Sequence, residues 1–190
     1  MTTFLILAPY GAFTLLMLVS SPVLSLSAAA AICLMVIAYD VFRGRAIKML
    51  GASSAILFGA LGGYLILVDH GLSSSAVKLV VDCGLLAIAL LSLAIRFPFT
   101  LQYAREVVDT QTAALPGFLT ANYIITAAWT LAFLLMLMAN VLMIYRPSLP
   151  FWSGLAIAFA ACNTALYFTK WYPRYRLAKS ATSCGALSAT

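Results

Sequence analysis

The side chains best placed for chemistry are a few ionisable residues around Asp82, inside a strongly apolar part of the chain. Lys78 precedes Asp82 with i,i+4 spacing, so a helix would put both on one face, with Asp82 about 6 Å further along the axis. Asp69 and His70 come just before, and a carboxylate beside an imidazole can serve in general acid–base catalysis. The simpler interpretation, which we favour, is that Lys78 pairs with Asp82 while the other two face water. Asp82, Asp69 and His70 are therefore weak catalytic candidates.

Familiar catalytic and metal-binding motifs are missing from the sequence, including GxSxG, HExxH and the Walker A pattern. With one histidine, the chain alone cannot supply a bis-histidine haem site or the usual multi-histidine metal sites. The cysteines occur singly, without a CxxC pair, and isolated cysteines in apolar stretches are usually small core residues. They are Cys33, Cys83, Cys162 and Cys184. We therefore expect no cofactor and no metal.

The composition indicates a membrane protein. Hydrophobic residues make up 64% of the 190 residues, and mean hydropathy is +1.06. Charged residues make up only 8%, against about 25% in ordinary soluble domains. A soluble fold of this size could not bury so much apolar surface, so lipid must cover part of it. The formal charge of +6 does not indicate nucleic-acid binding, because the basic residues flank apolar stretches and no soluble basic module exists.

Six apolar stretches are long enough to cross a bilayer, which needs roughly 20 residues per helix. Turn-forming residues separate them, such as the SSP sequence at 20–22 and GLSSS at 71–75. The sequence therefore predicts an all-α, polytopic transmembrane helix bundle with six spans, forming one domain over residues 1–170. The predicted spans are Phe4–Ser20, Val23–Phe42, Met49–Val68, Val77–Phe97, Phe118–Ile144 and Leu149–Thr169.

The distribution of basic residues predicts how the chain is threaded. Lys78 and Arg146 flank spans on one side of the membrane. All other Lys and Arg residues fall on the opposite side: Arg43, Arg45, Lys48, Arg96, Arg105, Lys170, Arg174, Arg176 and Lys179. The positive-inside rule then places both termini in the cytoplasm, with residues 171–190 as a short, basic, disordered tail. The alternative that the first span is a cleaved signal peptide is disfavoured, because MTTF has no basic start.

The third predicted span carries a stripe of small residues, Gly51, Ala55, Gly59 and Gly63, on one helix face. Small residues let helix backbones approach closely in lipid, and GALGG at 59–63 matches the GxxxG pattern. We expect this face to pack against another helix of the same chain. A homodimer interface is the alternative.

Polar residues near the ends of other spans have structural interpretations. Asp40 ends the second span, and Arg43 follows closely enough to neutralise it. Asn122 and Asn163 lie in the fifth and sixth spans, where asparagine usually forms hydrogen bonds between helices.

The segment RFPFTLQYAREVVD at 96–109 predicts a short amphipathic helix between the fourth and fifth spans. On a helical wheel, the apolar residues of 101–110 fall on one half and the polar residues on the other. Such a helix would lie flat on the cytoplasmic membrane surface. Its polar arc could dock a partner, or it could simply face water. The candidate docking residues are Arg105, Glu106 and Asp109.

The stretch RGRAIKMLGASSAILFGALGGYLIL at 43–67 resembles the second-to-third span region of the bacterial intracellular septation protein A family. Further residues fall in a similar order, over a likeness covering roughly residues 40–172: Pro98, Glu106, Asn122, Trp129, Asn140 and Trp152. The resemblance implies a small polytopic protein of the bacterial cytoplasmic (inner) membrane. It also implies a role in cell division and envelope synthesis through protein partners, without established catalytic residues.

The expected function is therefore a non-enzymatic, septation-associated interaction component of the envelope. Membrane lipids are the expected surroundings, with membrane-protein partners or a second copy of the chain as further partners, and no nucleic acid. One alternative is a membrane-embedded enzyme acting on a lipid or isoprenoid through Asp82, Asp69 and His70. The other alternative is a small transporter, which predicts polar residues along one path. We rank it third, because the two halves of the sequence show only faint similarity.

Overall fold

The computed structural model describes residues 2–68, 71–146, 148 and 150–187. Eight helices and no strand occur in these ranges. They are α1 (Thr2–Val19), α2 (Pro22–Phe42), α3 (Met49–Leu67), α4 (Ser74–Ala94), α5 (Phe99–Arg105), α6 (Thr110–Ala113), α7 (Pro116–Tyr145) and α8 (Phe151–Leu187). Each of the six predicted spans coincides with one of the long helices, to within a few residues at most ends.

Local sequence signals set several helix ends. Ser21 caps α2 by accepting a hydrogen bond from the Leu24 amide, with proline in the first turn. Ser73 caps α4 in the same way through the Ala76 amide. At the other end of α4 the chain turns sharply, because Arg96 adopts a left-handed φ of 58° and Pro98 then begins α5.

Within the described residues, four helices are long and apolar enough to cross a membrane: Pro22–Phe42, Met49–Leu67, Ser74–Ala94 and Gly117–Tyr145. In α1, Ala8–Val19 forms a shorter apolar helix. Large apolar side chains point outward along the long helices, such as Phe42 and Leu67, which are 91% and 82% exposed. Water would not tolerate this surface, so lipid covers it. The chain is an all-helical membrane protein.

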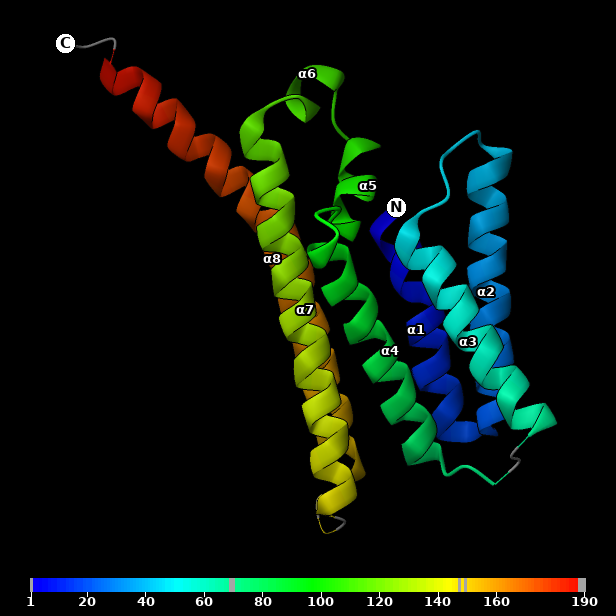
Figure 1. Cartoon of the computed structure of the whole chain (residues 1–190). Helices are drawn as coiled ribbons and strands as arrows, with labels where there is room; N and C mark the ends of the chain where they lie inside the picture. Colours follow the sequence, from blue (N-terminus) through cyan, green and yellow to red (C-terminus); the bar gives the residue numbers. More distant parts are fainter. Residues whose placement is uncertain (1, 69–70, 147, 149, 188–190) are drawn as a thin grey trace.

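The long helices form two groups that lie side by side in Figure 1. In one group α2 packs between α1 and α3, and in the other α7 packs between α4 and α8. Fewer contacts join the groups, through α3 with α4 and α5. The short helices α5 and α6 lie at one end of the bundle, which we call the α5 end (Figure 1). The core includes Phe58, whose ring lies 5.6 Å from that of Tyr10 and 5.5 Å from that of Phe13.

The predicted amphipathic helix over 101–110 is wrong in its extent and its surroundings. The segment forms two short helices, α5 and α6, because Asp109 accepts a hydrogen bond from the Thr112 amide at 3.3 Å and starts a new helix. Phe99 and Leu101 are 3% and 2% exposed, so they pack inside the protein rather than on a membrane surface. The helical wheel separated polar from apolar residues, but within the apolar half Leu101 is buried while Val107 is 74% exposed.

The stripe of small residues on α3 is only partly a packing face within the chain. A side chain at Gly51 would contact Ile37, but one at Gly59 or Gly63 would meet no described atom within 4 Å. The expectation that the whole stripe contacts another helix of the same chain is therefore wrong at those two positions. The homodimer alternative stays a prediction.

Close approach between helices occurs at other glycines. A Cβ at Gly62 would lie 3.6 Å from Leu26 on α2. A Cβ at Gly84 on α4 would lie 2.6 Å from the methyl carbons of Leu57 on α3.

The described part of the C-terminal tail is helical, because α8 continues from the sixth predicted span to Leu187. The prediction of a disordered tail is therefore wrong for these residues. Pro173 lies inside this helix and removes one backbone hydrogen bond. Two aromatic pairs with i,i+4 spacing lie next to the proline. Phe168 stacks on Tyr172 before it, with ring centroids 5.2 Å apart, and Trp171 stacks on Tyr175 across it at 5.1 Å. Such pairs stabilise a helix locally, so α8 extends past the bundle at the α5 end (Figure 1).

Candidate functional site

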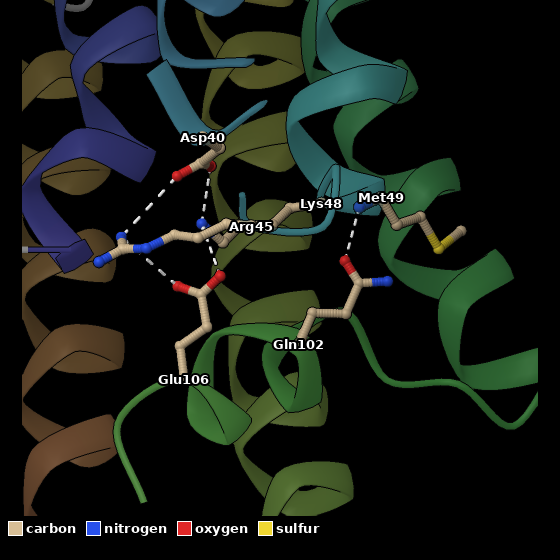
Figure 2. Close-up of polar contacts among 6 residues, drawn as sticks. All are labelled: Asp40, Arg45, Lys48, Met49, Gln102 and Glu106. Carbon is tan, nitrogen blue, oxygen red and sulfur yellow. Dashed lines mark hydrogen bonds and ion pairs between the residues drawn. The ribbon is translucent and has the colours of Figure 1, made fainter. Parts of the chain in front are cut away.

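Four charged side chains meet at the α5 end and form what we call the charge cluster: Asp40, Arg45, Lys48 and Glu106. Lys48 Nζ lies 2.7 Å from Asp40 Oδ2 and 3.2 Å from Glu106 Oε1, so it bridges the two carboxylates. Arg45 Nη1 lies at the longer distances of 3.9 Å from Asp40 and 3.8 Å from Glu106. Figure 2 shows the two cations facing the two carboxylates. The cluster is therefore balanced in charge.

The loop after α2 brings these residues together. It folds back where Gly44 takes a φ of 66°, and the Arg45 amide donates to the Asp40 carbonyl at 2.9 Å. Gln102 on α5 then accepts a hydrogen bond from the Met49 amide at 2.6 Å, at the start of α3 (Figure 2). This contact satisfies one of the free amides at a helix start and attaches α5 to α3.

The aromatic ring of Tyr103 completes the surroundings of the cluster. Lys48 Nζ lies 5.3 Å from the centre of this ring. Burial raises the pKa of Tyr103, and the nearby carboxylates of Asp40 and Glu106 raise it further. The hydroxyl therefore stays protonated across the physiological range. Arg43 does not neutralise Asp40 as expected, because its guanidinium lies 5.2 Å over the Tyr39 ring while Lys48 and Arg45 pair with the carboxylate.

The three candidate docking residues differ in their contacts within the chain. Glu106 belongs to the charge cluster. Asp109 caps α6, and hydrogen bonds from Thr112 lower the pKa of its carboxyl group. Arg105 is exposed at the end of α5. Contacts within the chain therefore account for the charges of Glu106 and Asp109.

Asp82 lies in a pocket of about 90 Å³ between α1, α4, α7 and α8. The Asn140 amide donates a hydrogen bond to Asp82 Oδ2, and Lys78 lines the same pocket. Asp82 is 7% exposed, and it lies about 12 Å along the helix axis from the start of α4, well inside the bundle. Lys78, Asp82 and Asn140 thus line one pocket. Asp69 and His70 lie outside the described residues.

Tyr10 separates the Asp82 pocket from a second, smaller pocket toward the α5 end. Its hydroxyl is hydrogen-bonded to that of Ser54, which also donates to the Leu50 carbonyl at 2.5 Å. The second pocket has a volume of about 30 Å³ and reaches the charge cluster, since Asp40, Lys48 and Tyr103 line it. Tyr10 lines both pockets.

Polar groups therefore follow one another through the bundle, and we call this series the polar column: Asn140, Asp82, Tyr10, Ser54, Asp40 and Lys48. A buried carboxylate and hydroxyls in series can bind and pass a proton. Sequence reasoning identified Asp82 but missed Tyr10 and Ser54, because a hydroxyl in an apolar helix carries no distinctive pattern. Among the described residues, no group of three or more His, Cys, Asp or Glu side chains could hold a metal.

The fold and site together define a helical membrane protein with a polar column through its bundle. Comparison with protein-family models, curated protein sequences and solved structures finds no match. The resemblance to the septation protein A family therefore stays an expectation from the sequence.

Proposed function

We propose that the chain crosses the bacterial cytoplasmic membrane six times, with both termini in the cytoplasm. The proposal adds α1 and α8 to the four helices whose length and composition suffice for crossing. Support comes from the basic residues, which gather at the α5 end and would face the cytoplasm under the positive-inside rule. An even number of spans also fits the placement of both termini on one side.

We infer that this membrane protein is a small transporter that moves protons across the membrane. The polar column is the observation that carries this proposal, because a membrane protein retains buried ionisable groups mainly where they serve a path. The two groups of three long helices resemble, in outline, the halves of transporters that move against each other. This reverses the ranking from the sequence, where the transporter stood third.

The size of the two pockets favours a proton over a larger solute as the species that passes Tyr10. They hold about 90 and 30 Å³, which suits a few water molecules. Waters and hydroxyl groups can relay a proton where a solute could not fit. Asp82, held by Asn140, would bind the proton, and the Tyr10–Ser54 hydrogen bond would be the narrowest point of the path.

Purified protein in liposomes tests the proposal, with a pH-sensitive dye inside and a potassium diffusion potential across the membrane. The parent should acidify or alkalinise the interior faster than protein-free liposomes do. Asp82→Asn should return the rate to the protein-free level, whereas Asp109→Asn, which removes a carboxylate outside the bundle, should not change it. The proposal fails if the parent matches protein-free liposomes, or if Asp82→Asn matches the parent.

The septation-associated interaction component stays a second candidate, and one observation favours it. Arg105 is exposed beside the charge cluster and has no part in the cluster's ion pairs, so a contact outside the chain would explain it. Arg105→Glu should then weaken crosslinking to a membrane partner without changing the melting temperature. The enzyme alternative depends on Asp69 and His70, which lie outside the described residues, so we do not propose it.

A further inference from the structure

A third pocket, larger than the two along the polar column, lies at the α5 end between α5, α6, α7 and α8, and Tyr103 lines both it and the smaller of those two. It has a volume of about 450 Å³, which falls in the range of sites for small-molecule and cofactor ligands. Apolar side chains form most of its wall, including Ala104, Val107, Phe118 and Ile125. We call it the α8 cleft. An apolar cleft of this size favours the apolar part of a ligand.

Two cations from α8 stand at the α8 cleft. Lys170 and Arg176 lie on either side of Pro173, about 9 Å apart along the helix axis. Arg176 lies close to the start of α7, since a Cβ at Gly117 would be only 3.0 Å from its Nη2 atom. No acidic side chain is among the described residues that line the cleft. The described lining of the cleft therefore carries a net positive charge.

The position of these cations relative to the membrane follows from Gly117. The part of α7 that can span a membrane begins at this residue and has 29 residues, so it is about 44 Å long and extends about 7 Å past each side of a hydrocarbon core of about 30 Å. Arg176 near its end and Lys170, about 9 Å away along α8, then lie on either side of the edge of the hydrocarbon. The apolar wall of the cleft extends from there along α7 to Ile125, toward the hydrocarbon. A ligand that fits both parts has an anionic head and an apolar tail.

We propose that the α8 cleft binds one anionic phospholipid from the membrane leaflet at the α5 end. Its phosphate lies between Lys170 and Arg176, and one acyl chain lies along the apolar wall formed by α7. Basic pockets between helices on the cytoplasmic side of membrane proteins are suited to anionic headgroups. Neither cation of the cleft belongs to the polar column, so the proposed site stands whether or not the protein moves protons.

Thermal melting of the detergent-solubilised protein tests this site, with phosphatidylglycerol titrated against phosphatidylcholine. A ligand that binds the folded state raises the melting temperature with concentration. The parent should gain stability from phosphatidylglycerol at much lower concentration than from phosphatidylcholine. In Lys170→Gln with Arg176→Gln, the concentration for half of the effect should rise about 30-fold, as expected for two headgroup-level cations.

A matched control pair keeps the net charge equal. Arg105→Gln with Arg174→Gln removes two exposed cations at the same end that do not line the cleft, and should leave the titration unchanged. Ala121→Phe keeps both cations but fills the cleft, and should abolish the preference for phosphatidylglycerol.

Three results would overturn the proposal. The first is an equal shift in both charge pairs, which would mean general attraction rather than a site. The second is an unchanged titration in Ala121→Phe, which would exclude the cleft even if the cation pair failed to fold. The third is the same stabilisation from inorganic phosphate, which would assign the cations to a free anion rather than a lipid.

Discussion

Replacing Lys48 by methionine should destabilise the protein strongly, because it leaves two carboxylates without their bridging cation. Lys48 and Asp40 have side chains only 7% and 8% exposed, and their charged atoms lie 2.7 Å apart. Removing one partner of such a buried pair costs about 3–5 kcal/mol. Arg45 lies 3.9 Å from Asp40 and can compensate in part, so we expect the lower end, about 3 kcal/mol.

Thermal melting in detergent measures this effect. For a chain of this size, 1 kcal/mol shifts the melting temperature by roughly 2–4 °C, so Lys48→Met should melt about 6–12 °C below the parent. Arg43→Met is the matched control, since it removes an exposed cation from the same loop and should cost no more than about 0.5 kcal/mol. Equal melting of Lys48→Met and the parent would refute the reasoning, as would equal losses in the two variants.

A double-mutant cycle separates the ion pair from other effects of the substitution. Asp40→Asn removes the carboxylate that Lys48→Met leaves unpaired, so the double variant should lose less stability than the sum of the single variants. Contacting residues in one network couple by about 0.5–3 kcal/mol. Strict additivity would mean that Lys48 acts through its packing against Tyr103 and not through its charge.

Three further predictions test the packing, the threading and the short helices. Gly84→Leu should overpack against Leu57 and cost about 1–3 kcal/mol of stability. Gly59→Leu, on an open face, should leave the melting temperature of the monomer unchanged. Equal losses of stability in the two variants would contradict this packing. Alkaline phosphatase fused after Leu72 should be active and after Lys48 inactive, and the reverse would refute the threading. Leu101→Asp should lower the melting temperature because this side chain is buried, whereas a residue lying on the membrane surface would leave stability nearly unchanged.

The long helices could be predicted from the sequence because lipid imposes a simple requirement on each of them. A span must be apolar along its whole length and must satisfy its backbone hydrogen bonds internally, so composition alone marks its ends. The second span was predicted as Val23–Phe42, and the helix is Pro22–Phe42. The stripe on α3 was harder, because periodicity identifies a face but not its neighbour. Gly59 points away from the described helices, and close approach occurs at Gly84.

The charge cluster could not be predicted because its members come from parts of the chain that only the fold brings together. Met49 and Gln102 are separated by 53 residues, and no local pattern connects α5 to the loop before α3. Reasoning from helical spacing could pair Arg105 only with Asp109 and Asp40 only with Arg43. In the structure the long-range contact prevails, since Lys48 is nearly buried and can approach both carboxylates closely.

The charge cluster has two roles in the proposed transporter that oppose each other. It attaches α5 to the first group of helices, through Lys48 and through Gln102, and this attachment stabilises the folded chain. Two members of the cluster, Asp40 and Lys48, also close the polar column at the α5 end, because together with Tyr103 they line its last pocket. A proton that reaches Tyr10 must pass this barrier. Weakening the cluster should therefore lower the stability of the fold and speed the passage of protons. Glu106 is the more exposed of the two carboxylates, so removing its charge should speed passage at the smaller cost in stability.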